Sequence, residues 1–228
     1  MQVQWLRSGM RFSALVAAFV VAASLCTLIA ARASTAQGQP LPGNPQRGKA
    51  LTYTCLGCHG VDGYKNAYPN YSVPELEGQH PEYLAAALKE YRDGDRDHIT
   101  MHAQASELSD QDIADVTAYF AGKPLTSHDK PQGTLPAAAQ ACTACHGQNG
   151  ISISPLYPSL AGQHPDYIER ALEEYKKGER KNPIMVAMAS PLKAADIEAI
   201  ADYFARQRPS LATESRPYTR LGMEHSGH

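Results

Sequence analysis

The sequence is poor in several features that mark common classes of protein. Its 228 residues include one tryptophan, four phenylalanines and five cysteines. Basic residues are not in excess, since 21 Lys and Arg stand against 23 Asp and Glu, and this balance argues against a nucleic-acid-binding protein. The 17 glycines and 16 prolines are too few for a collagen-like or wholly disordered chain. No segment alternates apolar and polar residues as a half-buried β-strand does.

One long apolar run is present, at the N-terminus. Arg7 and Arg11 precede it, it extends from residue 12 to residue 31, and an Ala-Arg-Ala cleavage signal ends at Ala33. This pattern predicts a secretory signal peptide over residues 1–33, cleaved after Ala33. The run, about 20 residues, is also long enough for an uncleaved N-terminal membrane anchor. Both alternatives place the rest of the chain outside the cytoplasm.

Four cysteines follow this segment, in two C-x-x-C-H patterns: Cys55, Cys58 and His59, and Cys142, Cys145 and His146. An even number of cysteines in an exported protein often forms disulfides. A thioredoxin-like redox pair and a structural zinc site are further alternatives. C-x-x-C-H, however, is the attachment signature of c-type haem, in which both thiols form thioethers with the porphyrin and the histidine binds the iron. Two copies predict two covalently attached haem c groups.

An internal repeat accompanies the two motifs. The segment from Leu76 to Tyr83 recurs from Leu160 to Tyr167, and further matches continue at an offset of 84 residues, with an offset of 87 at the cysteines. Such self-similarity indicates a tandem duplication with one haem per copy. We expect a first domain over residues 45–122, a linker over 123–134, a second domain over 135–208 and a mobile tail over 209–228.

Each copy has the sequence signals of helices. In the first, Pro81 begins a run with helical spacing that ends before Gly94, and Ser109 with Asp112 forms a capping box for a helix that ends at Gly122. In the second, helices are expected from Pro165 and over residues 193–206. A shorter helix should precede each C-x-x-C-H, although the segment 135–141 leaves little room for it. The fold class expected is all-α.

The iron position opposite the histidine determines what a haem can do. A second protein ligand there makes an electron carrier, whereas an open position permits oxygen or peroxide chemistry. Met101 and Met185 occupy matching positions, in what the sequence indicates is a loop between the last two helices of each copy, and are the expected ligands. The alternatives are that these methionines fill gaps in the core, or that Met188 replaces Met185. Bis-histidine ligation is a further alternative, since His98 and His102 flank Met101. Neither histidine is duplicated in the second copy, so we interpret both as exposed loop residues.

Two other pairs of residues are duplicated. His80 and His164 each precede a helix-opening proline, which favours a structural role where the helix begins. Arg96 and Arg180 are candidates for pairing with haem propionates or for solvated surface positions.

These residues resemble the cytochrome c4 family of exported dihaem cytochromes c. The C-x-x-C-H-G motifs, the two G-Q-H-P-x-Y segments, the methionine positions and the segment from Leu108 to Phe120 carry the resemblance, over residues 45–208. It implies two tandem class I cytochrome c domains around a pseudo-twofold axis, with His/Met ligation at both irons. It also implies electron transfer in a bacterial periplasm, from a quinol-oxidising complex to a terminal oxidase.

The expected function is therefore that of an electron carrier and not of an enzyme. Signal-peptide cleavage would remove three arginines and no acidic residue, leaving 18 basic and 23 acidic residues, a net charge of −5. This charge favours redox partners with basic surfaces. A cytochrome subunit of a membrane dehydrogenase or oxidase, and a dihaem peroxidase with one open iron, are the alternatives.

Overall fold

In the computed structural model, residues 41–214 are described except residues 124, 127 and 128, and this part of the chain is helical. Its only β-type pairings are isolated bridges, such as that between Arg96 and Arg180. The expected all-α fold is confirmed. No helix of the described residues is long and apolar enough to cross a membrane. The expected signal peptide or anchor, residues 1–33, lies outside them.

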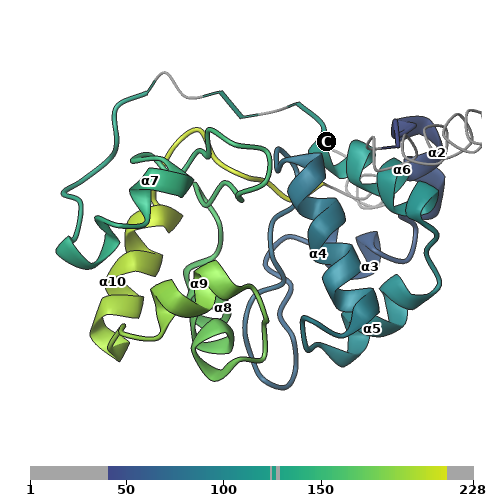
Figure 1. Cartoon of the computed structure of the whole chain (residues 1–228). Coiled ribbons are helices and arrows are strands. Elements are labelled where there is room, and N and C mark those ends of the chain that lie inside the picture. Colours follow the sequence, from purple (N-terminus) through teal and green to yellow (C-terminus); the bar gives the residue numbers. More distant parts are fainter. Residues whose placement is uncertain (1–40, 124, 127–128, 215–228) are drawn as a thin grey trace, which may run out of the picture. The chain divides into compact units, whose positions relative to one another are not determined.

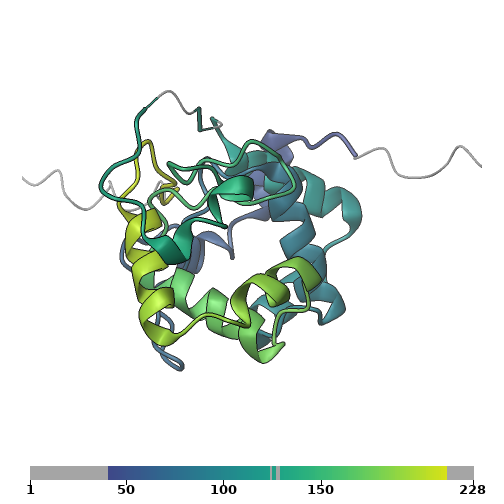
Figure 2. The same cartoon turned by 60° about the vertical axis from the view of Figure 1, so that its left-hand side comes forward.

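The helices fall into two sets that follow the sequence repeat (Figure 1). The first repeat contains α2 (Pro45–Leu51), α3 (Leu56–His59), α4 (Pro81–Asp93), α5 (Ile99–Ser106) and α6 (Asp110–Ala121). The second contains the 3-10 turn η1 (Ala137–Ala139), α7 (Thr143–His146), α8 (Pro165–Lys177), α9 (Pro183–Ala189) and α10 (Ala194–Ala205). The described part of the linker between them runs over the outside in both ribbon views (Figure 2).

The helix boundaries follow the expected signals. Pro81 occupies the first turn of α4, and Gly94 ends this helix in the left-handed conformation, with φ of 79°, which favours glycine because no Cβ clashes there. Ser109 and Asp112 form the expected capping box of α6. At the equivalent start of α10, only the Asp196 carboxylate takes part, accepting from the backbone N–H of Lys193.

The segment before the attachment motif separates the second repeat from the first. A full helix, α2, precedes the first C-x-x-C-H, whereas only the three-residue turn η1 precedes the second, as the short segment 135–141 predicted. Each repeat has its own apolar core. In the second repeat it includes Ile168, Leu172, Ile200 and Phe204, and in the first it is built around Leu56, Leu84, Val116 and Phe120.

The beginning of the expected tail does not extend freely from the second repeat. Leu211 is buried, with its N–H bonded to the carbonyl of Ala161, and Ala212 forms reciprocal backbone bonds with Glu77 of the first repeat. The Thr213 hydroxyl donates to the Glu75 carboxylate, 2.6 Å away. Residues 209–214 are therefore packed structure, a correction to the expected tail, and the rest of that tail lies outside the described residues.

The two repeats contact each other through equivalent residues. The N–H of Asp97 donates to the carbonyl of Glu179, and the N–H of Lys181 donates to the carbonyl of Asp95. Residues 95 and 97 are equivalent to 179 and 181, so each segment contacts its own counterpart. Such self-complementary pairing is typical of a twofold interface, here within one chain.

Candidate haem-binding sites

Each predicted axial histidine lies at the end of a single-turn helix that contains the second cysteine of its motif and is capped by the first. His59 ends α3 and His146 ends α7. The backbone N–H of each donates to the carbonyl of the first cysteine of its motif, Cys55 or Cys142, at 2.9 and 3.0 Å. This turn brings two thiols and one imidazole together, as attachment of a porphyrin above its proximal ligand requires.

Both imidazoles are held by a backbone carbonyl. Nδ1 of His59 lies 3.0 Å from the carbonyl oxygen of Pro74, and Nδ1 of His146 lies 2.8 Å from that of Pro158. A carbonyl oxygen only accepts, so Nδ1 carries the proton and Nε2 is left with its lone pair. Burial lowers the pKa of both histidines, which favours the neutral form that binds a metal. This orientation of a ligating histidine by a carbonyl is common at metal sites.

The four cysteines are partly buried and form no disulfide. Burial raises the pKa of Cys55 and Cys142, so both remain thiols at neutral pH. The two pairs lie in different repeats, and among the described residues no three His, Cys, Asp or Glu side chains gather as a metal site. The zinc alternative, which needs both pairs together, is therefore not realised. The free thiols and the oriented histidines fit haem c.

The expected methionine ligands lie in helices and not in loops, which corrects the sequence-based expectation. Met101 is in the first turn of α5 and Met185 in the first turn of α9. The backbone N–H of Met101 donates to Nδ1 of His98, at 3.2 Å, and the N–H of Met185 donates to the side-chain oxygen of Asn182, at 3.1 Å. His98 and Asn182 are equivalent N-cap residues, so both copies fix the methionine backbone in the same way.

This geometry changes the interpretation of the two histidines beside Met101. His98 is half-buried and caps α5, so it is not the exposed loop histidine that we expected. His102 is exposed, as expected, but belongs to α5, and its Nδ1 lies 2.8 Å from the carbonyl of Tyr91. Each therefore has a local structural partner.

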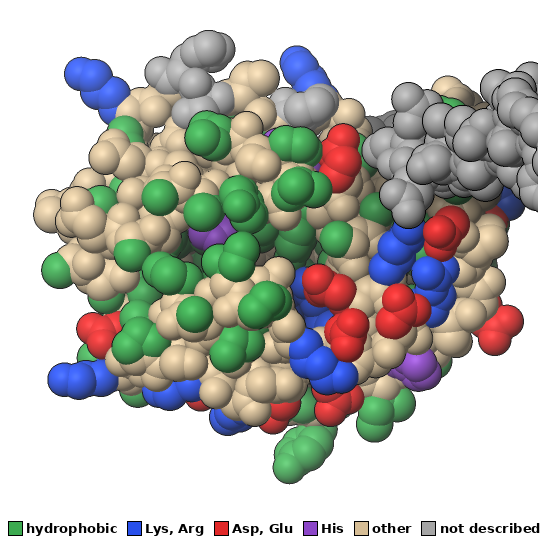
Figure 3. All heavy atoms as spheres, viewed as in Figure 1, with side chains coloured by type: hydrophobic (Ala, Val, Ile, Leu, Met, Phe, Trp, Pro, Cys, Tyr) green, Lys and Arg blue, Asp and Glu red, His purple; other side chains and the backbone are tan. Residues whose placement is uncertain are grey.

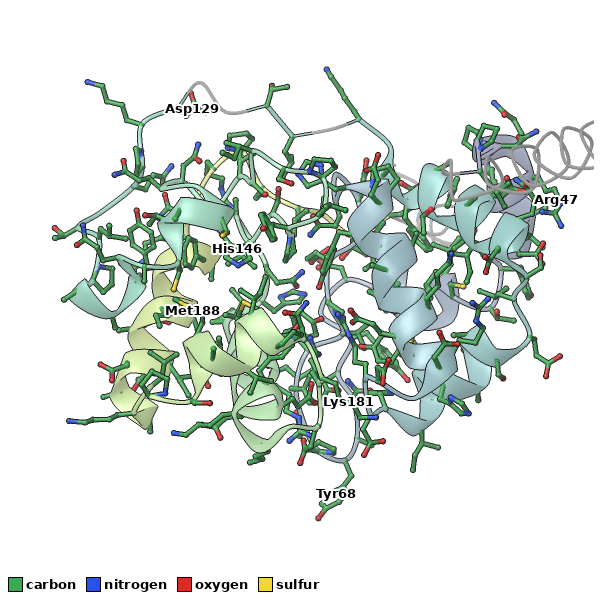
Figure 4. All side chains as sticks on the ribbon, in the orientation of Figure 1. Arg47, Tyr68, Asp129, His146, Lys181 and Met188 are labelled. Atoms are coloured by element: carbon green, nitrogen blue, oxygen red, sulfur yellow. The ribbon has the colours of Figure 1, made fainter. Side chains whose placement is uncertain are left out.

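In the second repeat the methionine helix faces the histidine. Cys142 and Met185 pack against the same apolar core. In Figure 4 the ring of His146 extends from α7 toward α9, the helix of Met185 and Met188. Met185 is partly buried, whereas Met188 is exposed. Met185 is therefore the better-placed of the two, although its packing also fits a residue that fills the core.

The face of the molecule around α7 and α9 is strongly apolar. Figure 3 shows hydrophobic side chains gathered over this part of the second repeat around a recessed histidine, whereas charged side chains gather over the first repeat. Among the exposed apolar residues are Ile153, Leu156, Ile184 and Met188. An apolar face of this kind suits contact with a porphyrin, which is itself largely apolar.

Arg96 and Arg180 are buried, which rules out the alternative that they are solvated surface residues. Their exposed fractions are 3% and 4%. Arg96 pairs with Glu90 and Arg180 with Glu174, both at 2.6 Å. Their guanidinium groups also lie over tyrosine rings, at 5.1–5.9 Å from the ring centroids. The structure thus gives both arginines protein partners at the contact between the repeats.

His80 and His164 begin α4 and α8 as N-cap residues, as their position before proline predicted. Each also reaches the other repeat: Nε2 of His80 lies 3.3 Å from the carbonyl of Ser152, and Nε2 of His164 lies 3.1 Å from the Glu75 carboxylate. The adjacent glutamines, Gln79 and Gln163, were not singled out from the sequence, although the repeated Gly-Gln-His-Pro segment was a signal for them. Both are buried and bind the backbone of the opposite repeat.

Comparison with known proteins agrees with the duplicated architecture. The family profile described as "Cytochrome c" matches twice, at residues 45–122 and 136–207. Cytochrome c4 of Pseudomonas aeruginosa is 34% identical over 178 residues, covering 71% of this chain and 87% of that protein. A solved structure of cytochrome c4 from Acidithiobacillus ferrooxidans superposes with a TM-score of 0.57 at 31% identity, covering 68% of this chain and 98% of that one.

A relative with a more specific name is the "Thiosulfate dehydrogenase electron acceptor" of Thiomonas intermedia, which is 29% identical over 180 residues and covers 71% of this chain and 82% of that protein. The profile matches and the cytochrome c4 relatives establish two cytochrome c domains and two covalently attached haem c groups. The chain belongs to the cytochrome c family and, within it, to the dihaem cytochrome c4 group of electron carriers.

Proposed function

We propose that this protein carries single electrons through a periplasmic respiratory chain, from a quinol-oxidising complex to a terminal oxidase. The observation that carries the proposal is the duplicated site: each repeat presents two thiols, a histidine held by a carbonyl, and a methionine at the start of a capped helix. A pair of sites built alike favours a carrier over an enzyme, in which one iron would be left open.

Cys55 and Cys58 would attach the first haem, and His59 and Met101 would bind its iron. Cys142 and Cys145 would attach the second haem, and His146 and Met185 would bind its iron. When bound, each haem iron takes up and releases one electron. The protein's own contribution is to hold both axial side chains in place in either redox state, because Pro74 and Pro158 orient the histidines and the N-caps of α5 and α9 orient the methionines. Little rearrangement then accompanies electron transfer.

The proposal includes export with removal of residues 1–33. N-terminal sequencing of the protein from its native host tests this part of the proposal. We expect the protein to be released without detergent and to lack residues 1–33. An intact N-terminus in the membrane fraction would favour the alternative of a membrane-complex subunit.

The route is tested by rapid mixing of the purified oxidised protein with a quinol-oxidising cytochrome c reductase and quinol, and then with a terminal oxidase. We expect reduction of both haems and their reoxidation. Because one relative is named as a thiosulfate dehydrogenase electron acceptor, a thiosulfate dehydrogenase with thiosulfate is the second donor to test. Reduction by that enzyme alone would replace the quinol-oxidising donor, and catalytic turnover with hydrogen peroxide would favour the peroxidase alternative.

A further inference from the structure

Two buried glutamines cross the contact between the repeats in a reciprocal arrangement. Gln163 of the second repeat binds the backbone of Glu75 in the first: its Oε1 accepts from the Glu75 N–H and its Nε2 donates to the Glu75 carbonyl, both at 3.0 Å. Gln79 of the first repeat binds the backbone of Ser159 in the second in the same way, both bonds at 2.9 Å. The exposed fractions of Gln79 and Gln163 are 4% and 5%.

Of the two backbone groups that each glutamine binds, the N–H belongs to the peptide that holds an axial histidine, whereas the carbonyl belongs to the next peptide. The Glu75 N–H and the Pro74 carbonyl are the two ends of one peptide unit, and this carbonyl accepts from Nδ1 of His59. A continuous chain of hydrogen bonds therefore runs from Gln163, through one peptide, to the imidazole of His59.

The same chain occurs in the other direction. The Ser159 N–H and the Pro158 carbonyl share a peptide, and this carbonyl accepts from Nδ1 of His146. Gln79 is thus connected to His146 of the other repeat as Gln163 is connected to His59.

We propose that Gln79 and Gln163 are positioning residues that tune the reduction potential of the haem in the opposite repeat. This inference rests on the proposed ligation by His59 and His146. Each glutamine acts through the peptide in front of it, so that the potential of each site depends on contact with the other repeat.

The direction of the effect follows from hydrogen-bond cooperativity. A peptide whose N–H donates to an acceptor is more polarised, and its carbonyl becomes a stronger acceptor. A stronger bond from Nδ1 to this carbonyl makes the imidazole a more basic ligand, which stabilises the ferric state. Loss of the glutamine oxygen should therefore raise the potential of the opposite haem.

A third glutamine provides a matched control. Gln207 is fully buried, and its Oε1 accepts from the N–H of Gln132 while its Nε2 donates to the carbonyl of the same residue, at 2.8 and 2.9 Å. The backbone of Gln132 forms no hydrogen bond with a predicted haem ligand among the described residues. Replacement of Gln207 therefore removes the same type of buried contact without touching either histidine carbonyl.

The test is a redox titration of the intact holoprotein followed by NMR, with the resonances of each haem assigned. In Gln163→Met we expect the potential of the first-repeat haem alone to rise, and in Gln79→Met that of the second-repeat haem alone. The shift should be on the order of threefold in the reduction equilibrium, about 30 mV at 59 mV per tenfold. Gln207→Met should leave both potentials unchanged. Equal shifts of both haems, or a shift of the haem in the substituted repeat, would overturn the proposal.

A second readout separates positioning from a merely structural role. In the reduced protein, the Nδ1 proton of His59 should move to higher field in Gln163→Met, because its hydrogen bond weakens, while that of His146 stays in place. If the Met variants fail to fold, Gln163→Glu and Gln79→Glu keep an acceptor for the N–H. The opposite potential should then stay unchanged or fall, and a rise would contradict the proposal.

Failure of this inference is distinguishable from failure of the proposed function. Unchanged potentials in Gln163→Met and Gln79→Met, with both haems still reduced and reoxidised by the redox partners, would overturn the tuning role alone. If the Nδ1 signals show that His59 or His146 is not an axial ligand in the unsubstituted protein, the proposed sites themselves are wrong.

Discussion

The duplicated ion pairs between Glu90 and Arg96 and between Glu174 and Arg180 offer a stability test within one chain. The two glutamates are equivalent in the repeat, but their surroundings differ. Glu174 is 3% exposed and accepts from both Arg170 and Arg180, each at 2.6 Å. Glu90 is 30% exposed and accepts, among the residues that the structure describes, from Arg96 alone, at 2.6 and 3.0 Å. The same substitution at the two positions should therefore have different costs.

The expected magnitudes follow from burial. Glu174→Gln keeps the side-chain volume but removes the charge, leaving the buried guanidinium of Arg180 without its carboxylate. Breaking a buried pair in this way costs about 3–5 kcal/mol in the free energy of unfolding. Glu90→Gln also leaves a buried guanidinium, that of Arg96, without its carboxylate, but the Glu90 side of this pair is 30% exposed and water can approach it there. Its cost should therefore lie between the exposed and the buried cases, at about 1–2 kcal/mol.

The assay is urea unfolding of the oxidised holoprotein, followed by far-UV circular dichroism at constant pH. Both variants should lower the transition midpoint without changing its slope, since the slope reports the surface exposed on unfolding. The loss should be clearly larger for Glu174→Gln. Equal losses, or a larger loss for Glu90→Gln, would refute the argument that burial determines the strength of these pairs.

Two further predictions concern the iron ligands and pH. Met101→Ala should lower the reduction potential of the first-repeat haem, since a thioether ligand raises it, and should let the ferrous iron bind carbon monoxide. Voltammetry and carbon monoxide titration measure both effects. In the matched control, Met188→Ala, neither the potentials nor carbon monoxide binding should change. Glu75 raises the pKa of His164 through their hydrogen bond, so their pairing should stabilise the fold fully below about pH 6.5 and progressively less as pH rises through the raised pKa. The difference in urea midpoint between the unsubstituted protein and His164→Gln should therefore shrink from about pH 6 to about pH 9, and a constant difference would count against the pairing.

Much of the fold could be predicted from the sequence because its signals are local. The starts of α4 and α8 follow from prolines in the first turn, and their ends from Gly94 and Gly178, which adopt positive φ. The haem attachment motifs are also local, since two cysteines and a histidine within five residues share one helical turn. These features need no knowledge of what lies next to them in space.

Other features depend on residues far apart in the chain and could not be predicted in this way. The partners of Gln79 and Gln163 lie 80 and 88 residues away, so the sequence shows the repeated motif without its role. The isolated bridge between Arg96 and Arg180 likewise joins residues 84 positions apart, in opposite repeats. Met101 was expected in a loop between two helices, but the side chain of His98, an unusual N-cap, accepts from the Met101 N–H at the start of a helix there.

The most direct test of the account is carbon monoxide binding to the dithionite-reduced holoprotein, measured by the visible spectrum. A carrier in which Met101 and Met185 fill the second axial positions should show no spectral change at either haem. Rapid, stoichiometric binding at one haem would contradict the account, since it would reveal an open iron and favour an enzyme.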